Sequence, residues 1–353
     1  MPDYRVLIHP ATYQRSIDYL DRLKAGAIAG AYLNSKLIDR DLEQLSIEQF
    51  IELLLQTKQP CIFAESAIYG DGRDWNQDEL SIIGDISIAT PVTVYDNGRH
   101  VQPEVHIRTF TATLIFTPGA LLRNGHQLVP ADWQEVTTDG AFDAAGYYRL
   151  YERRLLPGFA YINAVAQANN KKAFITIPGL GCGQFAGIFK GQLGDRLKHT
   201  LIELLETYGK SFPQIAAVYY DPYSECENDR TNINGIDFLV RPLNQGNIRK
   251  SQLCRPEFYA EVDREFDNCE LFSFVAWDHI SWPGNDFYED VRTTDDGVKA
   301  AATSSMAVMT GFEGTYDPRI NHYSPPAGYT DWGEVVSKNK IQLEVSNNLT
   351  ILP

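Results

Sequence analysis

The sequence predicts an α/β fold in which a mixed, largely parallel β-sheet lies between two layers of helices. In the second half of the chain, short apolar runs typical of buried strands alternate with amphipathic segments typical of helices. The segments between those runs are long enough for the crossovers that parallel strands need. Earlier in the chain, Asn97–Gly98 joins two segments rich in β-branched residues and indicates an antiparallel hairpin.

The first sixty residues are expected to form helices. Across residues 11–58, apolar side chains recur at spacings of three and four, which match the helical period. Ser46 lies three residues before Gln49 at the start of an apolar run, a pattern typical of a capping box. We therefore assign residues 1–60 to an N-terminal helical region.

Strands and one further helix are expected in the middle of the chain. Residues 80–103 carry β-branched side chains in alternation, and a strand that begins at residue 106 should end at Pro118–Gly119. Residues 146–169 return to a helical pattern, and Pro157–Gly158 predicts an interruption within it.

The second half of the chain should provide the parallel part of the sheet. Buried strands are predicted over 172–177, 214–222 and 269–278. An amphipathic helix over 194–210 separates the first two strands, and a helix of small residues over 297–311 follows the third. These elements imply a three-layer α/β/α sandwich.

The chain is accordingly divided into three parts. The N-terminal helical region, 1–60, precedes a main domain over residues 61–320, which holds the predicted sheet. Residues 321–353 are rich in Pro, Gly, Tyr and Asn and are expected to form an irregular tail.

The composition limits the classes of function. The 353 residues carry a formal net charge of −15 without a cluster of Lys and Arg, which disfavours nucleic acid as a partner. The five cysteines include no CxxC pair, so we expect a reducing compartment rather than disulfides or structural zinc. No signal-peptide pattern and no apolar run of about 18 residues is present, which predicts a cytoplasmic protein with no membrane partner.

Three unusual stretches each follow a predicted strand directly. They are PGLGCGQFAG (178–187), DPYSE (221–225) and WDHISWPGNDFYEDVRTTDDG (277–297). Because ligands of open α/β sheets bind beyond the carboxyl ends of the strands, we expect all three to meet at one edge of the sheet.

The first stretch has the composition of a phosphate-binding loop. Gly179, Gly181, Gly183 and Gly187 let the backbone approach a ligand closely, and free amides near a helix start can bind phosphate oxygens. The stretch has no P-loop lysine and does not match GxGxxG. A plain strand-to-helix turn is the alternative.

Strand, PGLGCGQFAG, helix and strand together resemble the diphosphate-loop region of macrodomains, which bind ADP-ribose. GDIS at 84–87 is similar to a stretch near the adenine site of macrodomains, and TPGALLRNG (117–125) stands where macrodomains usually have an Asn-rich loop. The acidic loop is more specific. Asp278, Asp286 and Asp296 are separated by eight and ten residues, as in the atypical macrodomain ADP-ribosyl hydrolases typified by the bacterial effector MavL.

This resemblance covers roughly residues 110–312 and implies a macrodomain-like fold and an activity. The implied reaction removes ADP-ribose from an arginine side chain by hydrolysis of an N-glycosidic bond. Ubiquitin is one candidate substrate. If the protein is a secreted effector, the implied place of action is the host cytosol. Three aspartates would be catalytic, with no metal and no cofactor. The implied catalytic residues are Asp278, Asp286 and Asp296. The residues implied or judged to bind ADP-ribose are Gly179, Gly181, Cys182, Gly183, Gln184, Phe185, Asp85, Trp282 and Phe287.

Carboxylates suit this chemistry. They stabilise the positive charge that develops on the ribose ring, activate water and pair with a cationic guanidinium. An empty site built for arginine should therefore contain unpaired carboxylates, whose pKa values are raised by mutual repulsion.

The acidic residues of the loop also have structural interpretations. Asp295 or Asp296 could cap the helix that starts near Gly297, and we assign this role to Asp295. Asp286 could stabilise a turn, and Asp278 could pair with Arg292.

The rings, the thiol and the imidazole have alternatives as well. Trp282, Phe287 and Tyr288 could belong to the core instead of the wall of a nucleotide site. Cys182 could be a nucleophile, but we interpret it as a packing residue. His279 is either a general base or structural, and a Mg²⁺ ion bound by the carboxylates remains an alternative.

Three rival functions stay open at this point. The protein could be a non-catalytic ADP-ribose-binding module, a hydrolase of small ADP-ribose derivatives, or an interaction scaffold that uses its N-terminal helices. Only an ADP-ribosyl hydrolase would combine ADP-ribose binding with aspartate-dependent turnover on a modified protein.

Overall fold

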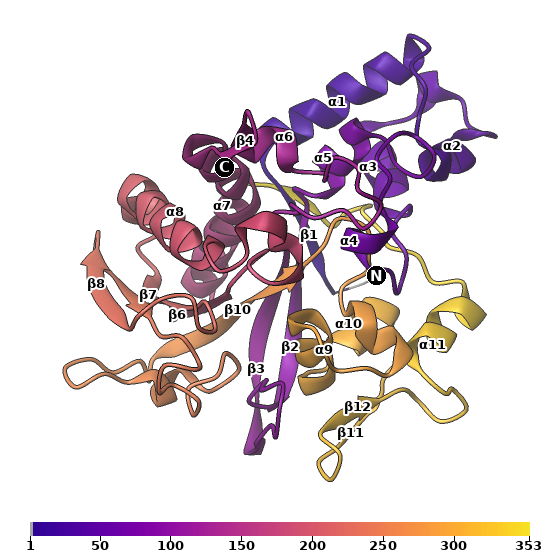
Figure 1. Ribbon diagram of the computed structural model, residues 1–353. Helices are drawn as coiled ribbons and strands as arrows, with labels where there is room; N and C mark the ends of the chain where they lie inside the picture. Colours follow the sequence, from indigo (N-terminus) through magenta and orange to yellow (C-terminus); the bar gives the residue numbers. More distant parts are fainter. Residues whose placement is uncertain (1–2) are drawn as a thin grey trace.

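Nine strands form one mixed sheet in the computed structural model, which describes residues 3–353 (Figure 1). The spatial order is β13-β1-β2-β3-β10-β6-β7-β9-β8. The bounds are β1 (Arg5–Ile8), β2 (Ser87–Asp96), β3 (Val105–Pro118), β6 (Lys172–Pro178), β7 (Ile215–Asp221), β8 (Asp229–Ile233), β9 (Ile236–Val240), β10 (Cys269–Trp277) and β13 (Leu349–Ile351). Four neighbouring pairs in the middle of the sheet are parallel: β3 with β10, β10 with β6, β6 with β7, and β7 with β9. The mixed, largely parallel sheet is thus confirmed.

Helices cover both faces of this sheet. Helices α7 (Ala144–Ala168) and α8 (Leu193–Tyr208) pack on one face. The other face carries α9 (Asp295–Ala302) and α10 (Ser305–Thr310), with α11 (Trp332–Asn339) beside them. Alternate residues of a strand enter different cores: in β3, Leu114 joins one apolar cluster and Ile115 the other. The predicted three-layer arrangement is therefore confirmed.

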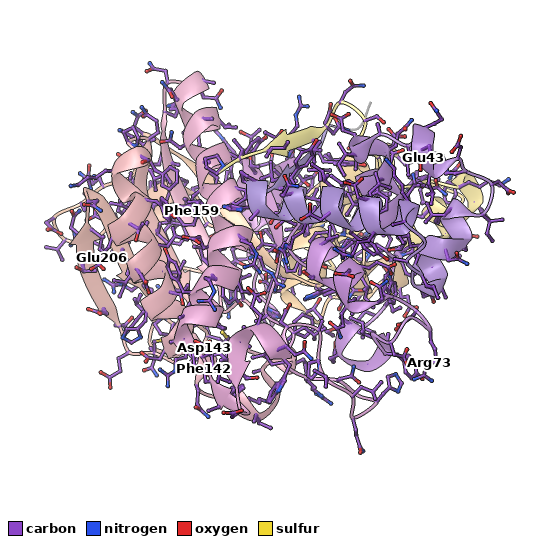
Figure 2. The ribbon with its side chains drawn as sticks, turned by 90° about the horizontal axis from the view of Figure 1, so that it is seen from above. Glu43, Arg73, Phe142, Asp143, Phe159 and Glu206 are labelled. Carbon is purple, nitrogen blue, oxygen red and sulfur yellow. The ribbon has the colours of Figure 1, made fainter. Side chains whose placement is uncertain are left out.

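The N-terminal helices extend the apolar cluster that contains Leu114. They are α1 (Pro10–Lys24), α2 (Ala31–Leu37), α3 (Ile47–Leu55), α4 (Ala64–Ala67) and α5 (Gln77–Ile83). Seen from above, this part of the chain lies beside α7 (Figure 2). The predicted capping box at the start of α3 is confirmed, because Ser46 Oγ accepts from the Gln49 amide and the Gln49 side chain accepts from the Ser46 amide.

Two helix predictions need correction. Helix α7 runs through Pro157 without the expected interruption. Its buried face packs on the sheet, and Gly158 permits close approach, since an added Cβ would lie 2.8 Å from the Phe274 ring. The helix predicted over 297–311 is instead two helices, because Thr303 adopts an extended backbone and Ser304 exchanges hydrogen bonds with Thr93 of β2.

The ends of the chain both enter the main sheet. Strand β1 pairs with β2 and with β13. Residues 321–353, for which an irregular tail was predicted, therefore supply helix α11 and two strands, β13 and β12 (His322–Ser324). The division into three parts remains a prediction. The remaining short elements are α6 (Trp133–Val136), β4 (Thr137–Thr138), β5 (Ala141–Phe142), β11 (Thr315–Asp317), β12 (His322–Ser324) and the 3₁₀ turns η1 (Leu42–Gln44), η2 (Gln184–Phe189), η3 (Gly209–Ser211), η4 (Pro256–Tyr259) and η5 (Asn285–Glu289).

Candidate active site

The loops after the parallel strands meet at one edge of the sheet, as predicted. Strands β3, β10, β6 and β7 are parallel neighbours, so their carboxyl ends share that edge. The Gly119 amide, just after β3, donates to Trp277 O at 3.1 Å. An added Cβ on Gly119 would collide with the amide of Gly181, so the loops after β3 and β6 are in direct contact.

The glycine loop after β6 depends on its glycines. Gly181 and Gly187 have φ values of +71° and +55°, a region that favours glycine. The Leu122 amide donates to Phe185 O at 2.8 Å, which joins the loop to the segment after β3. Within residues 3–353, the amides of Gly183 and Gln184 find no acceptor, and both residues are exposed. Exposed amides of this kind can bind an anion.

Asp278 begins the acidic loop directly after β10 and is only 4% exposed. Its Oδ1 accepts from the amides of Ile280 and Ser281, both at 2.7 Å. Its Oδ2 accepts from Ser281 Oγ at 2.6 Å and from Asn285 Nδ2 at 3.3 Å. The carboxylate thus fixes the first turn of the loop, and both oxygens have partners.

Asp286 lies in η5 and is 2% exposed. Its Oδ2 accepts from the amides of Thr293 and Thr294 at 3.0 and 3.1 Å. The hydroxyls of the same two threonines donate to the carboxylate at 2.6 Å. Gly297 packs so closely that an added Cβ would collide with Asp286 Oδ1. Asp286 therefore holds the loop against the start of α9.

Asp296 differs from the other two aspartates. It is 3% exposed, its Oδ1 accepts from the Gly284 amide at 2.6 Å, and its Oδ2 has no hydrogen-bond partner among residues 3–353. Burial raises the pKa of this carboxyl well above its usual range, and the charges of Asp286 and Asp278 raise it further. The group is therefore a buried acid that tends to keep its proton.

The expectation of unpaired carboxylates is met only in part. Asp296 has a free oxygen and a raised pKa, but burial contributes more to that pKa than repulsion does. The expectation is wrong for Asp278 and Asp286, since each accepts four hydrogen bonds. The short loop supplies these donors from its own backbone amides, its hydroxyls and the Asn285 side-chain amide.

Two structural interpretations of the loop are also wrong. Asp295 does not cap α9, because Thr294 is the N-cap residue and its hydroxyl accepts from a first-turn amide at 3.0 Å. Arg292 does not pair with Asp278, because both of its terminal nitrogens donate to Asp96 at 2.9 Å.

The large rings of the acidic loop belong to the core. Trp282 is 4% exposed and its Nε1 donates to Lys58 O at 3.2 Å, while Phe287 is fully buried. Their predicted place on the wall of a nucleotide site is therefore wrong, because the hydrophobic effect buries these rings under the helices of the second layer. Phe185, on the glycine loop, remains partly exposed.

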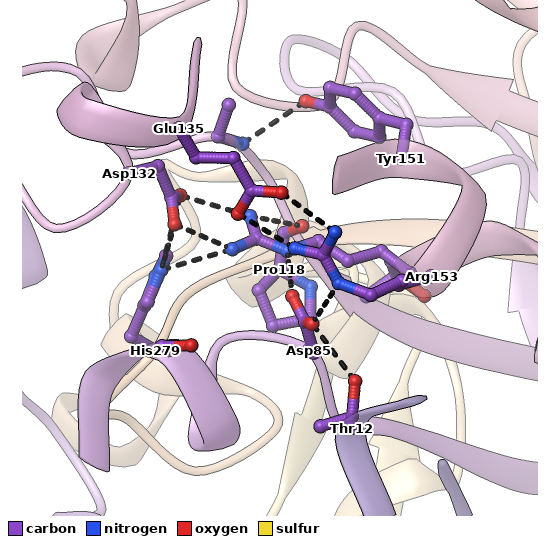
Figure 3. Close-up of polar contacts among 12 residues, drawn as sticks. Thr12, Asp85, Pro118, Asp132, Glu135, Tyr151, Arg153 and His279 are labelled. Atoms are coloured by element: carbon purple, nitrogen blue, oxygen red, sulfur yellow. Dashed lines mark hydrogen bonds and ion pairs between the residues drawn. The ribbon is translucent and has the colours of Figure 1, made fainter. Parts of the chain in front are cut away.

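Asp85 forms ion pairs with three arginines and does not present a free carboxylate (Figure 3). Arg153 Nε lies 2.7 Å and Arg154 Nε 3.0 Å from its two oxygens, and Arg15 contacts it as well. Burial alone would raise the pKa of Asp85, but these three guanidinium groups hold it well below the usual range. Its assignment to ADP-ribose binding does not fit this geometry.

Arg154 connects several segments of this edge and was missed in the sequence. It is 1% exposed and its Nη2 lies 2.7 Å from Asp132 Oδ1, while its Nη1 donates to Gly119 O at 3.0 Å. His279 Nε2 lies 3.2 Å from Asp132 Oδ2, which ties the acidic loop to the same network. Arginine is normally exposed, so helical periodicity gave no signal for this buried one.

A further segment joins the acidic loop to the glycine loop. Glu65 O, in α4, accepts from the Gly125 amide at 2.5 Å, and Arg123 Nη1 donates to Gln184 Oε1 at 2.9 Å. The pKa of Glu65 is raised by burial and by the charge of Asp278. Residues 120–125 thus contact both α4 and the glycine loop, and the Ile62 amide, just before α4, donates to Asn285 Oδ1 of the acidic loop at 3.0 Å.

Other chemistries receive little support from the geometry. The Cys182 thiol is buried, its Sγ lies 3.5 Å from Leu180 O, and burial raises its pKa well above the usual range, which favours packing over nucleophilic attack. In the described part of the chain, no group of three or more His, Cys, Asp and Glu side chains is arranged to hold a metal ion.

Comparison with known proteins gives one family. The family model described as "Macrodomain effector MavL" matches residues 4–329. No curated protein matches the sequence. None of the helices within residues 3–353 has the length and apolar character needed to cross a membrane.

Proposed function

The chain belongs to the MavL macrodomain effector family, and from this premise we propose that it is an ADP-ribosyl hydrolase acting on modified arginine. Membership ties the protein to ADP-ribose. We further propose that the linkage is to arginine, that the three aspartates are catalytic and that ubiquitin is the substrate.

The Asp296 carboxyl is the observation that carries the proposal. It is a buried acid with a raised pKa and one free oxygen, and two further aspartates of the same loop lie close enough to affect its ionisation. Perturbed carboxyl groups of this kind are frequent at catalytic sites. They are costly for stability, so a purely structural loop would have little reason to keep one.

An arginine substrate would change the state of this acid. A guanidinium group beside Asp296 would favour the ionised carboxyl and so release its proton. The ionised group, with Asp286 and Asp278 nearby, would then stabilise the positive charge that develops on the ribose.

Hydrolysis itself needs one water. The bond between C1 of the ribose and the guanidine nitrogen breaks, and the nitrogen keeps the electron pair. The oxygen of water bonds to C1, and the proton that it loses passes through a carboxylate to the guanidine, which leaves as guanidinium. We assign this proton transfer to Asp296, because Asp278 and Asp286 are already held by four donors each.

The glycine loop would hold the other end of the substrate. The exposed amides of Gly183 and Gln184 suit the diphosphate, and Phe185 offers a partly exposed ring nearby. A protein of net charge −15 can bind a diphosphate in this way because backbone dipoles supply the attraction.

The test is to incubate the full chain with ubiquitin that carries ADP-ribose on arginine and to follow the modification by intact-mass measurement. We expect release of free ADP-ribose by the wild type and none by Asp296→Asn, which keeps the shape of the side chain. Ubiquitin modified on glutamate is the control for linkage. Equal rates for the wild type and the variant, or no release at all, would refute the hydrolase proposal.

A non-catalytic ADP-ribose reader is the second candidate. It is favoured by the burial of the three aspartates, none of which is more than 4% exposed. Calorimetry with free ADP-ribose separates the two candidates when it is combined with the cleavage assay, because a reader binds the nucleotide and leaves the modified protein intact.

A further inference from the structure

Residues 58–62 lie alongside the first part of the acidic loop. The Gln59 amide donates to Ile280 O at 2.8 Å, and Gln59 O accepts from the Trp282 amide at 2.8 Å. These two bonds form a parallel bridge between Gln59 and Ser281. The N-terminal region therefore pairs with the acidic loop backbone to backbone.

Lys58 makes the most unusual of these contacts. Its side chain is 3% exposed, and its Nζ donates to His279 O at 2.5 Å and to Asp278 O at 3.3 Å. The same atom lies 4.0 Å from the centre of the Trp277 ring. No carboxylate within residues 3–353 forms an ion pair with it. A buried lysine without such a partner is costly, which indicates a role beyond stability.

A second contact reaches the Asp278 side chain. The Ile62 amide donates to Asn285 Oδ1 at 3.0 Å, and Asn285 Nδ2 donates to Asp278 Oδ2 at 3.3 Å. Residues 58–62 thus hold Asp278 both by its backbone carbonyl and, through Asn285, by its carboxylate.

We propose that Lys58 is a positioning residue that fixes the backbone at Asp278 and His279, so that residues 58–62 form part of the active site. This inference rests on the proposed hydrolase function. The N-terminal region, whose role the sequence left open, would then be required for turnover and not for binding of the nucleotide.

The pH dependence of kcat provides a second test of the inference, because Lys58 carries a buried charge. The charged groups that act on Lys58 are Asp278, Asp296 and Arg154. Burial lowers the pKa of Lys58 to about 7, the two aspartates oppose this shift, and Arg154 adds to it. By reciprocity, the ammonium group favours the ionised form of Asp296. Its removal should therefore move the acidic limb of the kcat profile to higher pH.

The test compares Lys58→Met with Lys36→Met. Methionine is similar in length to lysine and removes a buried charge, so the variant is expected to fold. Lys36 lines the same surface cavity of about 230 Å³ as Lys58 but is only half-buried, which makes it a matched control. Both variants are assayed on ubiquitin that carries ADP-ribose on arginine, and binding of free ADP-ribose is measured by calorimetry.

For Lys58→Met we expect a fall in kcat of at least about tenfold, because small displacements of catalytic groups have effects of this size. The Kd for ADP-ribose should stay unchanged, the acidic limb should move to higher pH, and amide hydrogen exchange should rise across residues 278–286. Lys36→Met should match the wild type in all four measurements.

Three results would overturn the inference. The first is wild-type kcat and pH dependence in Lys58→Met, the second is unchanged hydrogen exchange across 278–286, and the third is a loss of ADP-ribose binding together with kcat, which would contradict a pure positioning role. If the wild type cleaves no substrate, the hydrolase proposal fails, and hydrogen exchange still decides separately whether Lys58 fixes the loop.

Discussion

Asp296→Asn should make folding stability less dependent on pH. In the unfolded chain this carboxyl titrates near its ordinary pKa of 3.8, whereas burial and nearby charge raise the pKa in the folded protein well above that value. Between the two pKa values the unfolded chain has lost the proton and the folded protein has kept it. Stability therefore falls as pH rises through this window, and a side chain that does not titrate removes the effect.

The size of this stability change follows from the slope of the free energy of unfolding against pH. One group contributes at most about 1.4 kcal/mol to the free energy of unfolding per pH unit inside the window. Against this, asparagine brings amide hydrogens to a position where Asp296 Oδ2 has no partner, at a cost of about 1–3 kcal/mol at every pH. The variant should thus be less stable than the wild type near pH 4 and overtake it roughly 1–2 pH units higher.

Urea unfolding followed by tryptophan fluorescence at several pH values measures this difference directly. Asp39→Asn, at an exposed aspartate, is the control for the loss of one negative charge. Parallel stability profiles for Asp296→Asn and the wild type would refute the reasoning, because they would mean that Asp296 ionises normally in the folded protein.

Two further substitutions test the packing of the site. Arg154→Met leaves the buried Asp132 carboxylate without its 2.7 Å guanidinium partner and should cost about 3–5 kcal/mol of stability in urea unfolding; a loss below about 1 kcal/mol would contradict the importance of the network. Gly297→Ala adds a methyl group that collides with Asp286 and should lower the Tm, with a cost of about 1–3 kcal/mol, together with hydrolase activity. A wild-type Tm and kcat in that variant would show that the contact is unimportant.

The sheet and its layers could be predicted because they depend on apolar pattern. Leu197, Leu201, Leu204 and Leu205 recur at the helical period and are all buried in α8. The apolar runs at β6, β7 and β10 could only be strands that are covered on both faces. Strands of a few residues, such as β13, carry too little pattern to be recognised.

The site was harder to predict because its polar groups depend on contacts distant in the sequence. The spacing of the acidic loop marked Asp278, Asp286 and Asp296 as a set, and Asp296 is indeed a perturbed acid. It could not show that Asp278 and Asp286 accept hydrogen bonds from their own loop, nor that Asp85 is held by arginines from α1 and α7. Propensity also favours Asp and Thr similarly as helix caps, so local sequence could not choose Thr294 over Asp295.

The pairing of β1 with β13 has a consequence for synthesis of the protein. Val6 lies opposite Leu349, and the Tyr4 hydroxyl donates to Glu344 O at 3.2 Å. The ribosome releases β1 long before β13, because the two strands lie far apart in the sequence. Until then, one side of β1 offers unpaired backbone groups to any other extended chain. The nascent protein is therefore open to aggregation and to chaperones at this edge until β13 has been made.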